Sequence, residues 1–542
     1  MDNRKGSFVR GAAVLAIAGL IVKLIGAIYR IPLANIIETD GLKFYEVAYP
    51  WYSWLLVISS AGLPTAISKL VSERVTLGDY RGARDIFRGA MRILIIIGTV
   101  TMLIMLLGAE LFAGITYPSY AQEMIQKQSM VFRALSPALL FVSIMCAYRG
   151  YLQGMQLMMG TAVSQVVEQV GKLIIGFTLA ARLFPKGPEY AAMGALLGVS
   201  ASELIALIVI WLFYKRNKGR FNAKLSSSLR TKPMRFRHIA KKLLVIAIPI
   251  TIGASIMPLT GIMDSAMITR GLAGIGFTID EASSAYAILR GNVTPIINMP
   301  AALTTALAIS LVPAISARMA TKNYKGVRSA SKMGMKLALI IGAPCAAGLY
   351  VLAEPIIRLL FTALEGQEII LAADLMKSCA VGVLFLSLVQ TMTGVLQGMG
   401  RPNIPVINLV FGGILKVITM LILMRIPTIN IQGAAISTII CYAAAGILDT
   451  IYVLRKTGMR VKFWDMFLKP ISAAVVMAVS VSLCYNALNA AGHNTLATVG
   501  SVAVGVVVYA ALMFLLKMFS PEELEFMPGG HKLRRLMYRN ER

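Results

Sequence analysis

Long apolar runs, separated by short polar segments, follow one another along the whole chain. A helix needs about 20 predominantly apolar residues to cross about 30 Å of hydrocarbon. The strands of a transmembrane barrel would instead alternate in polarity over about ten residues, which these continuous runs do not do. The pattern predicts about fourteen membrane-spanning helices, at residues 8–34, 47–71, 90–115, 131–151, 160–183, 191–214, 238–262, 283–313, 334–353, 370–396, 404–425, 432–454, 467–488 and 496–518.

Composition favours the same fold class. The chain is 57% hydrophobic and 14% charged, whereas soluble proteins are roughly 45–50% apolar and about 25% charged. We therefore predict an all-α polytopic membrane protein. The first apolar run follows RKGSFVR, has full spanning length and shows no small-residue cleavage site. We interpret it as the first helix rather than as a secretory signal.

A short motif occurs twice, as GYLQGM at 150–155 and as GVLQGM at 394–399, 244 positions apart. The same offset aligns residues 78–98 with 322–342 without gaps and places Lys172 opposite Lys416. One offset that holds through several helices and their loops indicates an internal duplication. We expect each copy of the motif to end a helix, with glycines that let the chain turn sharply.

The duplication predicts two parallel six-helix repeats, related by a pseudo-two-fold axis along the membrane normal, plus two extra C-terminal helices. In such architectures the interface between the halves is the expected cavity, and rocking of the halves gives alternating access. The predicted parts are an N-lobe at 1–218, a basic linker at 219–237, a C-lobe at 238–457, the two extra helices at 458–520 and a basic tail at 521–542.

The net charge of +28 follows the predicted topology. About 38 of the 53 Lys and Arg residues fall on one side of the predicted membrane and about 7 on the other. Because basic loops stay in the cytoplasm, both termini are expected there. Attraction to anionic membrane lipids accounts for the basic linker, so we predict no nucleic-acid partner.

Charged residues inside the predicted spans are the candidate functional residues. A charge at the bilayer centre costs about 2.5–3.5 kcal/mol on insertion scales and usually faces a bundle interior or a wet cavity. Lys23 and Arg30 are seven residues apart and share one face of the first helix, and Arg290 lies deep in the eighth. We interpret these three as a substrate site, with structural pairing as the alternative.

Five further charged residues are candidates for the same cavity. Glu168 precedes Lys172 by four residues, which is the favourable order for an ion pair on one helix face. We expect that pair to form. Lys416 is the repeat counterpart of Lys172, and Glu46 and Asp264 are acids near the outer ends of their spans.

Patterns typical of enzymes are missing from the sequence. It has no phosphate-binding glycine loop and no nucleophile elbow, and its three histidines are isolated. The five cysteines lie scattered in predicted spans, without the spacing of metal ligands. We predict no catalytic residue, no metal and no cofactor. Coupling to an ion or to the membrane potential stays open.

Three segments resemble a known family: GLPTAISKLVSE (62–73), RGYLQGMQLMMGTAVSQVVEQ (149–169) and TGVLQGMGRPNIP (393–405). With two six-helix halves and two extra helices, the chain resembles the polysaccharide-transport branch of the multidrug/oligosaccharidyl-lipid/polysaccharide flippase superfamily. Within that branch it is similar to the stage V sporulation protein B / YtgP group of MurJ-like lipid II flippases.

The resemblance implies a flippase of the bacterial plasma membrane. Its substrate would be an undecaprenyl-pyrophosphate-linked saccharide such as lipid II, moved to the outer leaflet for peptidoglycan synthesis. Lys23, Arg30 and Arg290 match the cavity-lining helices 1 and 8, and Glu46 matches an acid of helix 2. The family's helix 2 arginine has no counterpart in WYSWLLVISS, and residues 467–518 match a groove for the lipid tail. The implied partners are this lipid-linked saccharide, membrane lipids and cell-wall synthesis proteins.

Two other functions stay open. A MATE-like multidrug or cation antiporter of the same superfamily would need unpaired acids facing the cavity, whereas the intramembrane charges here lean basic. A non-transporting membrane scaffold would not need the duplication or the buried charges.

Overall fold

The computed structural model describes residues 2–226, 228, 235–459, 461–490 and 494–520, and all regular structure in this part of the chain is helical. Twelve of the described segments are long and apolar enough to cross a membrane. The chain is therefore an all-α polytopic membrane protein, as predicted. The predicted total of fourteen spans stays a prediction, because Ile28–Thr76 counts as one segment and α6 carries several charges.

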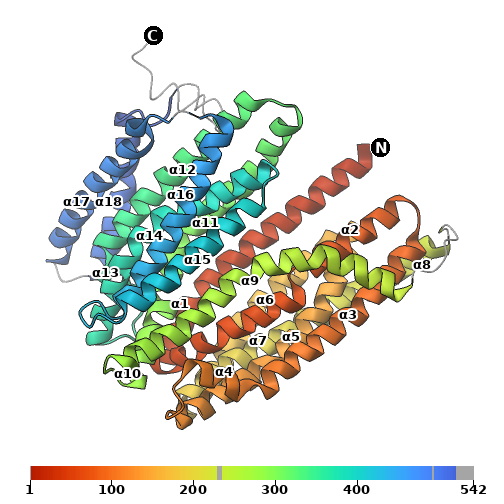
Figure 1. Ribbon diagram of the computed structural model, residues 1–542, viewed down its shortest axis with the longest axis horizontal. Helices are drawn as coiled ribbons and strands as arrows, with labels where there is room; N and C mark the ends of the chain where they lie inside the picture. Colours follow the sequence, from red (N-terminus) through yellow and green to blue (C-terminus); the bar gives the residue numbers. More distant parts are fainter. Residues whose placement is uncertain (1, 227, 229–234, 460, 491–493, 521–542) are drawn as a thin grey trace. The chain divides into compact units, whose positions relative to one another are not determined.

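The chain folds into two compact units, Met1–Ala287 and Ile288–Arg542. The first unit contains α1 (Asp2–Ser60), α2 (Leu63–Thr76), α3 (Tyr80–Leu107), α4 (Ala109–Thr116), α5 (Gln122–Gly154), α6 (Met158–Leu183), the 3-10 turn η1 (Phe184–Lys186), α7 (Pro188–Arg216), α8 (Lys218–Ser226), α9 (Phe236–Gly274) and α10 (Ile279–Ala287). Within it, α7 packs against both α5 and α6, and α9 packs along α1 (Figure 1).

The second unit contains the π-helical η2 (Ile288–Val293), α11 (Thr294–Ala320), α12 (Tyr324–Val351), α13 (Ala353–Leu360), α14 (Gln367–Gly398), α15 (Asn403–Leu423), α16 (Gln432–Thr457), the π-helical η3 (Trp464–Leu468), α17 (Lys469–Asn489) and α18 (Asn494–Leu515). Here α14 packs against α11, α12 and α16, while α17 packs against α12 and α18. The sequence assigns residues 238–287 to the second repeat, whereas their packing joins them to the first unit. The predicted part boundaries stay predictions.

The first predicted span and most of the second lie in a single helical element, α1, which folds back on itself; the second span continues into α2. Glu38 has φ 55° and ψ −178°, which breaks the helix between its two arms. Arg30 and Glu46 would be about 24 Å apart along a straight helix of this length, but their side chains meet at 3.4 Å. The two arms therefore run antiparallel, which brings intramembrane residues of the first two predicted helices together.

Element bounds repeat at the offset that the sequence revealed. Adding 244 to the bounds of α3 and α4 gives those of α12 and α13. The N-caps repeat as well: Asp79 accepts a hydrogen bond from the Gly82 amide at 2.8 Å, and Asn323 accepts one from the Gly326 amide at 2.9 Å. These matches support the duplication, while the parallel arrangement of two six-helix halves stays a prediction.

The repeated motif has a different role from the one predicted. Its helices do end where expected, α5 at Gly154 and α14 at Gly398, but the motif glycines are helical and do not form the turn. A Cβ on Gly150 would lie 2.8 Å from Ile67 Cβ, and one on Gly394 would lie 2.7 Å from the Ala308 carbonyl oxygen. The glycines thus allow close helix packing, and the turns use positive φ angles further on, at Gln156 and Gly400.

Candidate functional site

Arg30 lies among polar and aromatic side chains of the two arms of α1. Its Nη1 lies 3.4 Å from Glu46 Oε1, and its guanidinium lies 5.5 Å from the Tyr49 ring centroid. Tyr49 stacks on Tyr45 at 5.7 Å. The Arg30 side chain is 24% exposed, whereas that of Glu46 is 2% exposed. The break at Glu38 therefore gives Arg30 an acidic partner without fully burying its charge.

The predicted substrate site also contains Lys23 and Arg290. Lys23 lies in α1, but its side chain is outside the described part of the structure. Arg290 is half-buried in the π-helical turn η2, in the second unit. A π-helical turn inserted in a longer helix often marks a functional position. The predicted Lys23–Arg30–Arg290 site stays a prediction.

A buried network of four charges crosses α5, α6 and α7 in the first unit. Lys172 Nζ lies 2.7 Å from Glu168 Oε1 and 2.9 Å from Glu203 Oε1. Arg149 Nη2 lies 2.9 Å from Glu168 Oε2, and its Nε donates to Ser164 Oγ at 3.1 Å. The expected Glu168–Lys172 pair is present. Two basic and two acidic groups cancel in charge, so Lys172 offers little positive charge to an anionic ligand.

Sequence reasoning did not predict the contacts of two members of this network. Arg149 directly precedes the first copy of the repeated motif and is not among the predicted candidates, and Glu203 is an intramembrane acid with no evident partner in the sequence. An i, i+4 spacing can reveal Lys172 as a partner of Glu168, but contacts between residues 19 and 31 positions apart leave no such spacing signal. The network is not repeated, since the position 244 residues after Glu168 is Gly412.

Lys416 and Asp264 are both buried, the first in α15 of the second unit and the second in α9 of the first unit. The structure brings together Arg30 with Glu46, and Glu168 with Lys172.

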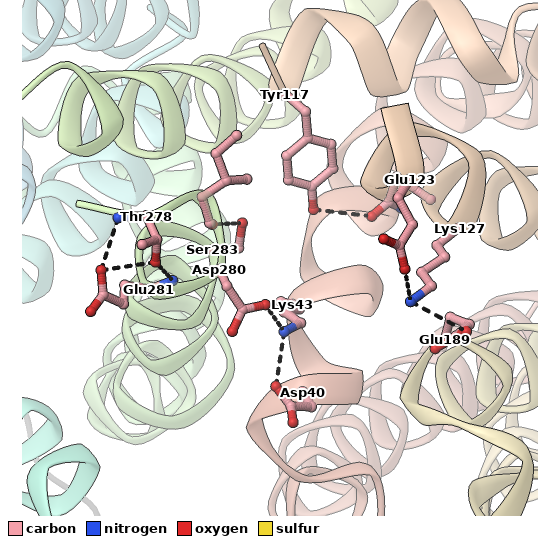
Figure 2. A network of polar contacts seen from close by, with 12 residues as sticks. Asp40, Lys43, Tyr117, Glu123, Lys127, Glu189, Thr278, Asp280, Glu281 and Ser283 are labelled. Carbon is pink, nitrogen blue, oxygen red and sulfur yellow. Dashed lines mark hydrogen bonds and ion pairs between the residues drawn. The ribbon is translucent and has the colours of Figure 1, made fainter. Parts of the chain in front are cut away.

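A second polar network lies where α10 begins (Figure 2). Lys43 Nζ contacts Asp40 Oδ1 at 2.8 Å and also contacts Asp280 Oδ1. Thr278 caps α10: its amide and its hydroxyl both donate to Glu281 Oε2 at 2.8 Å. This capping arrangement satisfies helix N-terminal groups and presents Asp280 to Lys43. The Lys43 ion pair therefore links α10 to the second arm of α1.

Tyr117 and Gln128 extend the packing beside this network. Burial raises the pKa of the Tyr117 hydroxyl above its ordinary value, so the group stays protonated and donates to Gln128 Oε1 at 3.4 Å. Gln128 Nε2 in turn donates to the Phe44 carbonyl at 3.0 Å. A buried amide bonded on both sides fixes α5 against the second arm of α1.

Comparison with known proteins decides the family. Residues 8–319, more than half of the chain, match the family model described as polysaccharide biosynthesis protein. The chain belongs to the polysaccharide biosynthesis protein family. Residues 285–422 also match the MatE model. Both matches place this polysaccharide biosynthesis family member in the multidrug/oligosaccharidyl-lipid/polysaccharide superfamily, which confirms the resemblance.

Three proteins of Bacillus subtilis (strain 168) are similar over most of this family member. The uncharacterized membrane protein YabM is 30% identical, over 98% of this chain and 97% of its own. Stage V sporulation protein B is 25% identical, over 97% and 98%. Lipid II flippase MurJ is 27% identical, over 84% of each chain.

Solved structures share the fold. An inward closed conformation of lipid II flippase MurJ superposes with a TM-score of 0.68 at 13% identity, over 93% of this chain and 98% of that chain. An inward-facing multidrug resistance MATE family transporter gives 0.65 at 18% identity, over 83% and 98%. MurJ is named as a lipid II flippase and the MATE protein as a transporter, and neither name denotes an enzyme. At these identities the solved structures establish the fold alone.

Proposed function

We propose that this protein is an alternating-access flippase that moves an undecaprenyl-pyrophosphate-linked saccharide of the lipid II type to the outer leaflet of the bacterial plasma membrane. The similarity to lipid II flippase MurJ over 84% of both chains carries this proposal. The intramembrane basic residues agree with it in sign, because a pyrophosphate is anionic and arginine can bind phosphate oxygens through two donors at once.

Within this function, Arg30, Lys23 and Arg290 bind the anionic head group. Of these three residues, Arg30 has the most clearly defined surroundings. Its side chain is partly exposed, and its Nη1 lies 3.4 Å from the Glu46 carboxylate. Glu46 holds the guanidinium in place, and the Tyr49 ring covers one side of it. A ligand phosphate would then compete with Glu46 for the arginine. The neutral Arg149–Glu168–Lys172–Glu203 network instead holds α5, α6 and α7 together.

The deciding experiment is complementation of a strain depleted of its lipid II flippase, read out by leaflet-resolved labelling of lipid II. We expect the wild-type chain to restore outer-leaflet lipid II. Arg290→Ala and the double substitution Lys23→Ala with Arg30→Ala should abolish the exposure while the protein still inserts.

The Arg30 substitution has to be combined with a substitution of Glu46. Arg30→Ala alone leaves the buried Glu46 carboxylate without its arginine, which destabilises the folded protein. We therefore expect Arg30→Gln with Glu46→Gln to insert normally and still fail in complementation. Arg133→Ala, which breaks the exposed pair of Arg133 with Glu110 at 2.7 Å, should complement like wild type. Normal lipid II exposure in the Arg30→Gln, Glu46→Gln and Arg290→Ala variants would refute the proposed site.

A multidrug antiporter is the second candidate, favoured by the MatE match over residues 285–422. Its cation-binding acid would have to be available, but Glu168 is held by both Arg149 and Lys172. Drug efflux from vesicles that depends on Glu168 or Asp264 would support this candidate over the lipid flippase.

A further inference from the structure

One buried acid in the second unit has no basic partner among the described residues, unlike three other intramembrane acids. Asp449 lies in α16 with 1% of its surface exposed. Its Oδ1 accepts a hydrogen bond from Asn408 Nδ2 of α15 at 2.7 Å. Its Oδ2 is buried and has no hydrogen-bond partner among the described residues. By contrast, Glu46, Glu168 and Glu203 each contact an arginine or a lysine.

The surroundings of Asp449 are apolar. Residues four apart form one face of a helix, and the face of α16 that carries Asp449 also carries Cys441, Ala445 and Val453, all buried. Leu388 and Met392 of α14 belong to the same buried cluster as Val453. Among the described residues, the Asn408 amide nitrogen is therefore the only hydrogen-bond donor to the Asp449 carboxyl group, and it contacts one of the two oxygens.

Charged groups of α15 and α14 lie too far along their helices to act as a counter-ion. On α15, Lys416 lies eight residues beyond Asn408, about 12 Å along the helix. On α14, Lys377 pairs with Asp374 at 3.0 Å, three turns before Leu388. The salt bridges among the described residues do not include Asp449.

Two basic residues of α12, Arg328 and Lys336, contact other groups. Arg328 donates from its Nε to the carbonyl of Thr457, eight residues beyond Asp449. Lys336 places its Nζ 5.7 Å from the ring centroid of Phe519, which follows α18. The Asp449 carboxyl group therefore depends on the Asn408 amide for its polar contact.

An ionised carboxylate needs several hydrogen bonds or a cation when it is buried, and it otherwise takes up a proton. A metal ion is a poor fit, because Asn408 presents its nitrogen rather than its oxygen to the acid, and hard cations take about six oxygen ligands. We propose that Asp449 and Asn408 form a proton-binding site between α15 and α16, in which the Asp449 carboxylate reversibly takes one proton from water. No other bond is made or broken.

The site gives the transporter a route to proton coupling, and this step rests on the proposed function. In a conformation that admits water to α16, Asp449 releases its proton. In the conformation described here, where Asp449 is buried, its carboxyl group keeps the proton. If one proton moves in each cycle, a pH difference of about one unit across the membrane would change the equilibrium ratio of the transported lipid between the two leaflets about tenfold.

Infrared difference spectroscopy on the purified full-length protein tests the site without any substrate. We expect the wild type minus Asp449→Asn spectrum near neutral pH to contain the carbonyl band of a protonated carboxylic acid. Asn408→Leu should move this band to higher frequency, because the carbonyl loses its hydrogen bond. The matched control, Asp374→Asn, removes an exposed acid paired with Lys377 and should show the loss of carboxylate bands without any carbonyl band of a protonated acid. A wild type minus Asp449→Asn spectrum that shows carboxylate bands and no protonated-acid band would overturn the proposal.

Reconstituted vesicles with a fluorescent lipid II analogue then test the coupling. A pH difference of about one unit should shift the distribution of the analogue about tenfold for wild type and for Asp374→Asn, and should not shift it for Asp449→Asn. If Asp449→Asn responds like wild type, the coupling is wrong even where the protonated acid is present. If the wild type moves no analogue at all, the proposed function fails, and the infrared result still decides the proton site.

Discussion

Two basic residues of the predicted spans, Lys172 and Arg30, differ in how closely their charges are paired and in how far their side chains are exposed. Lys172 sits between two carboxylates at 2.7 and 2.9 Å, whereas Arg30 lies 3.4 Å from a carboxylate and keeps about a quarter of its side chain exposed. A fully paired charge in a membrane interior holds helices together, while a partly exposed one can still reach a ligand. This contrast separates Arg30 from Lys172, which the sequence alone placed in one group.

The role of Lys172 can be tested by stability. Lys172→Met leaves Glu203, which is 2% exposed, without its basic partner. Breaking a buried pair from one side costs about 3–5 kcal/mol, so we expect a large loss of thermal stability in detergent. Adding Glu203→Gln should recover most of the loss, because the stranded charge is removed.

The control for Lys172 is the exposed pair of Arg358 and Glu354 at 2.8 Å, with both side chains about half exposed. Arg358→Ala should cost less than about 1 kcal/mol. Equal losses for Lys172→Met and Arg358→Ala would mean that the four-charge network is not a stabilising element.

Individual elements depend on short contacts that the hydropathy pattern does not contain. The second arm of α1 holds α10 through Lys43 and Asp280, and through the Tyr286 hydroxyl, which donates to the Glu46 carbonyl at 3.3 Å. The Lys43 side chain is 6% exposed, but the two acids that it contacts are more than half exposed. Removing the lysine therefore leaves no buried charge behind at this contact, which makes the substitution easy to interpret.

We expect Lys43→Met to loosen α10 without unfolding the protein. A hydrogen bond to a charged group contributes about 1.5 kcal/mol, so amide hydrogen exchange over Ile279–Ala287 should rise roughly tenfold. Glu123→Gln, which removes an i, i+4 pair with Lys127 inside α5, should leave that exchange unchanged. An unaltered exchange rate of α10 in Lys43→Met would show that the ion pair does not hold it.

Helix crossings at the repeated motif give a second test at this scale. Gly150→Ala places a Cβ 2.8 Å from Ile67 Cβ and 2.9 Å from the Pro64 carbonyl oxygen. Overpacking of this kind costs about 1–3 kcal/mol, which a lower melting temperature should reveal. Gly114→Ala in α4 meets no atom within 4 Å and should be neutral or slightly stabilising. The glycine role would be refuted if both substitutions behaved alike.

Duplication and charge asymmetry describe the molecule as a whole. The bounds of α3 and α4 recur 244 residues later in α12 and α13, but the four-charge network belongs to the first unit and the Asn408–Asp449 pair to the second. The two units thus share the bounds of these helices and carry different buried polar groups.

The distribution of basic residues gives a prediction for the whole chain. About 38 of 53 Lys and Arg residues fall on one predicted side of the membrane, which is expected to be the cytoplasmic side. A reporter enzyme that is active only in the cytoplasm should therefore be active when it is fused after Arg542. The same reporter inserted at Glu365, on the poorly charged side, should be inactive, and a periplasm-type reporter should be active there. The reverse pattern would contradict the predicted orientation of both termini.

The sequence by itself determined the helical membrane class and the family, because these depend on local hydropathy and on characteristic strings of residues. It also predicted a duplication, which the recurring bounds of α3 and α4 in α12 and α13 support. It also predicted the Glu168–Lys172 pair, since an i, i+4 spacing on one helix is local information. The predicted substrate site, the parallel arrangement and the topology are still to be tested.

Only the tertiary structure decided which charges are satisfied. Arg149 and Glu203 reach Glu168 and Lys172 from other helices, and Asp449 meets an amide instead of a base. The motif glycines likewise proved to be crossing points rather than turns. Contacts between helices depend on which face each helix turns toward its neighbour. The sequence shows only which positions are apolar or polar, so the pairing of buried charges between different helices cannot be read from it.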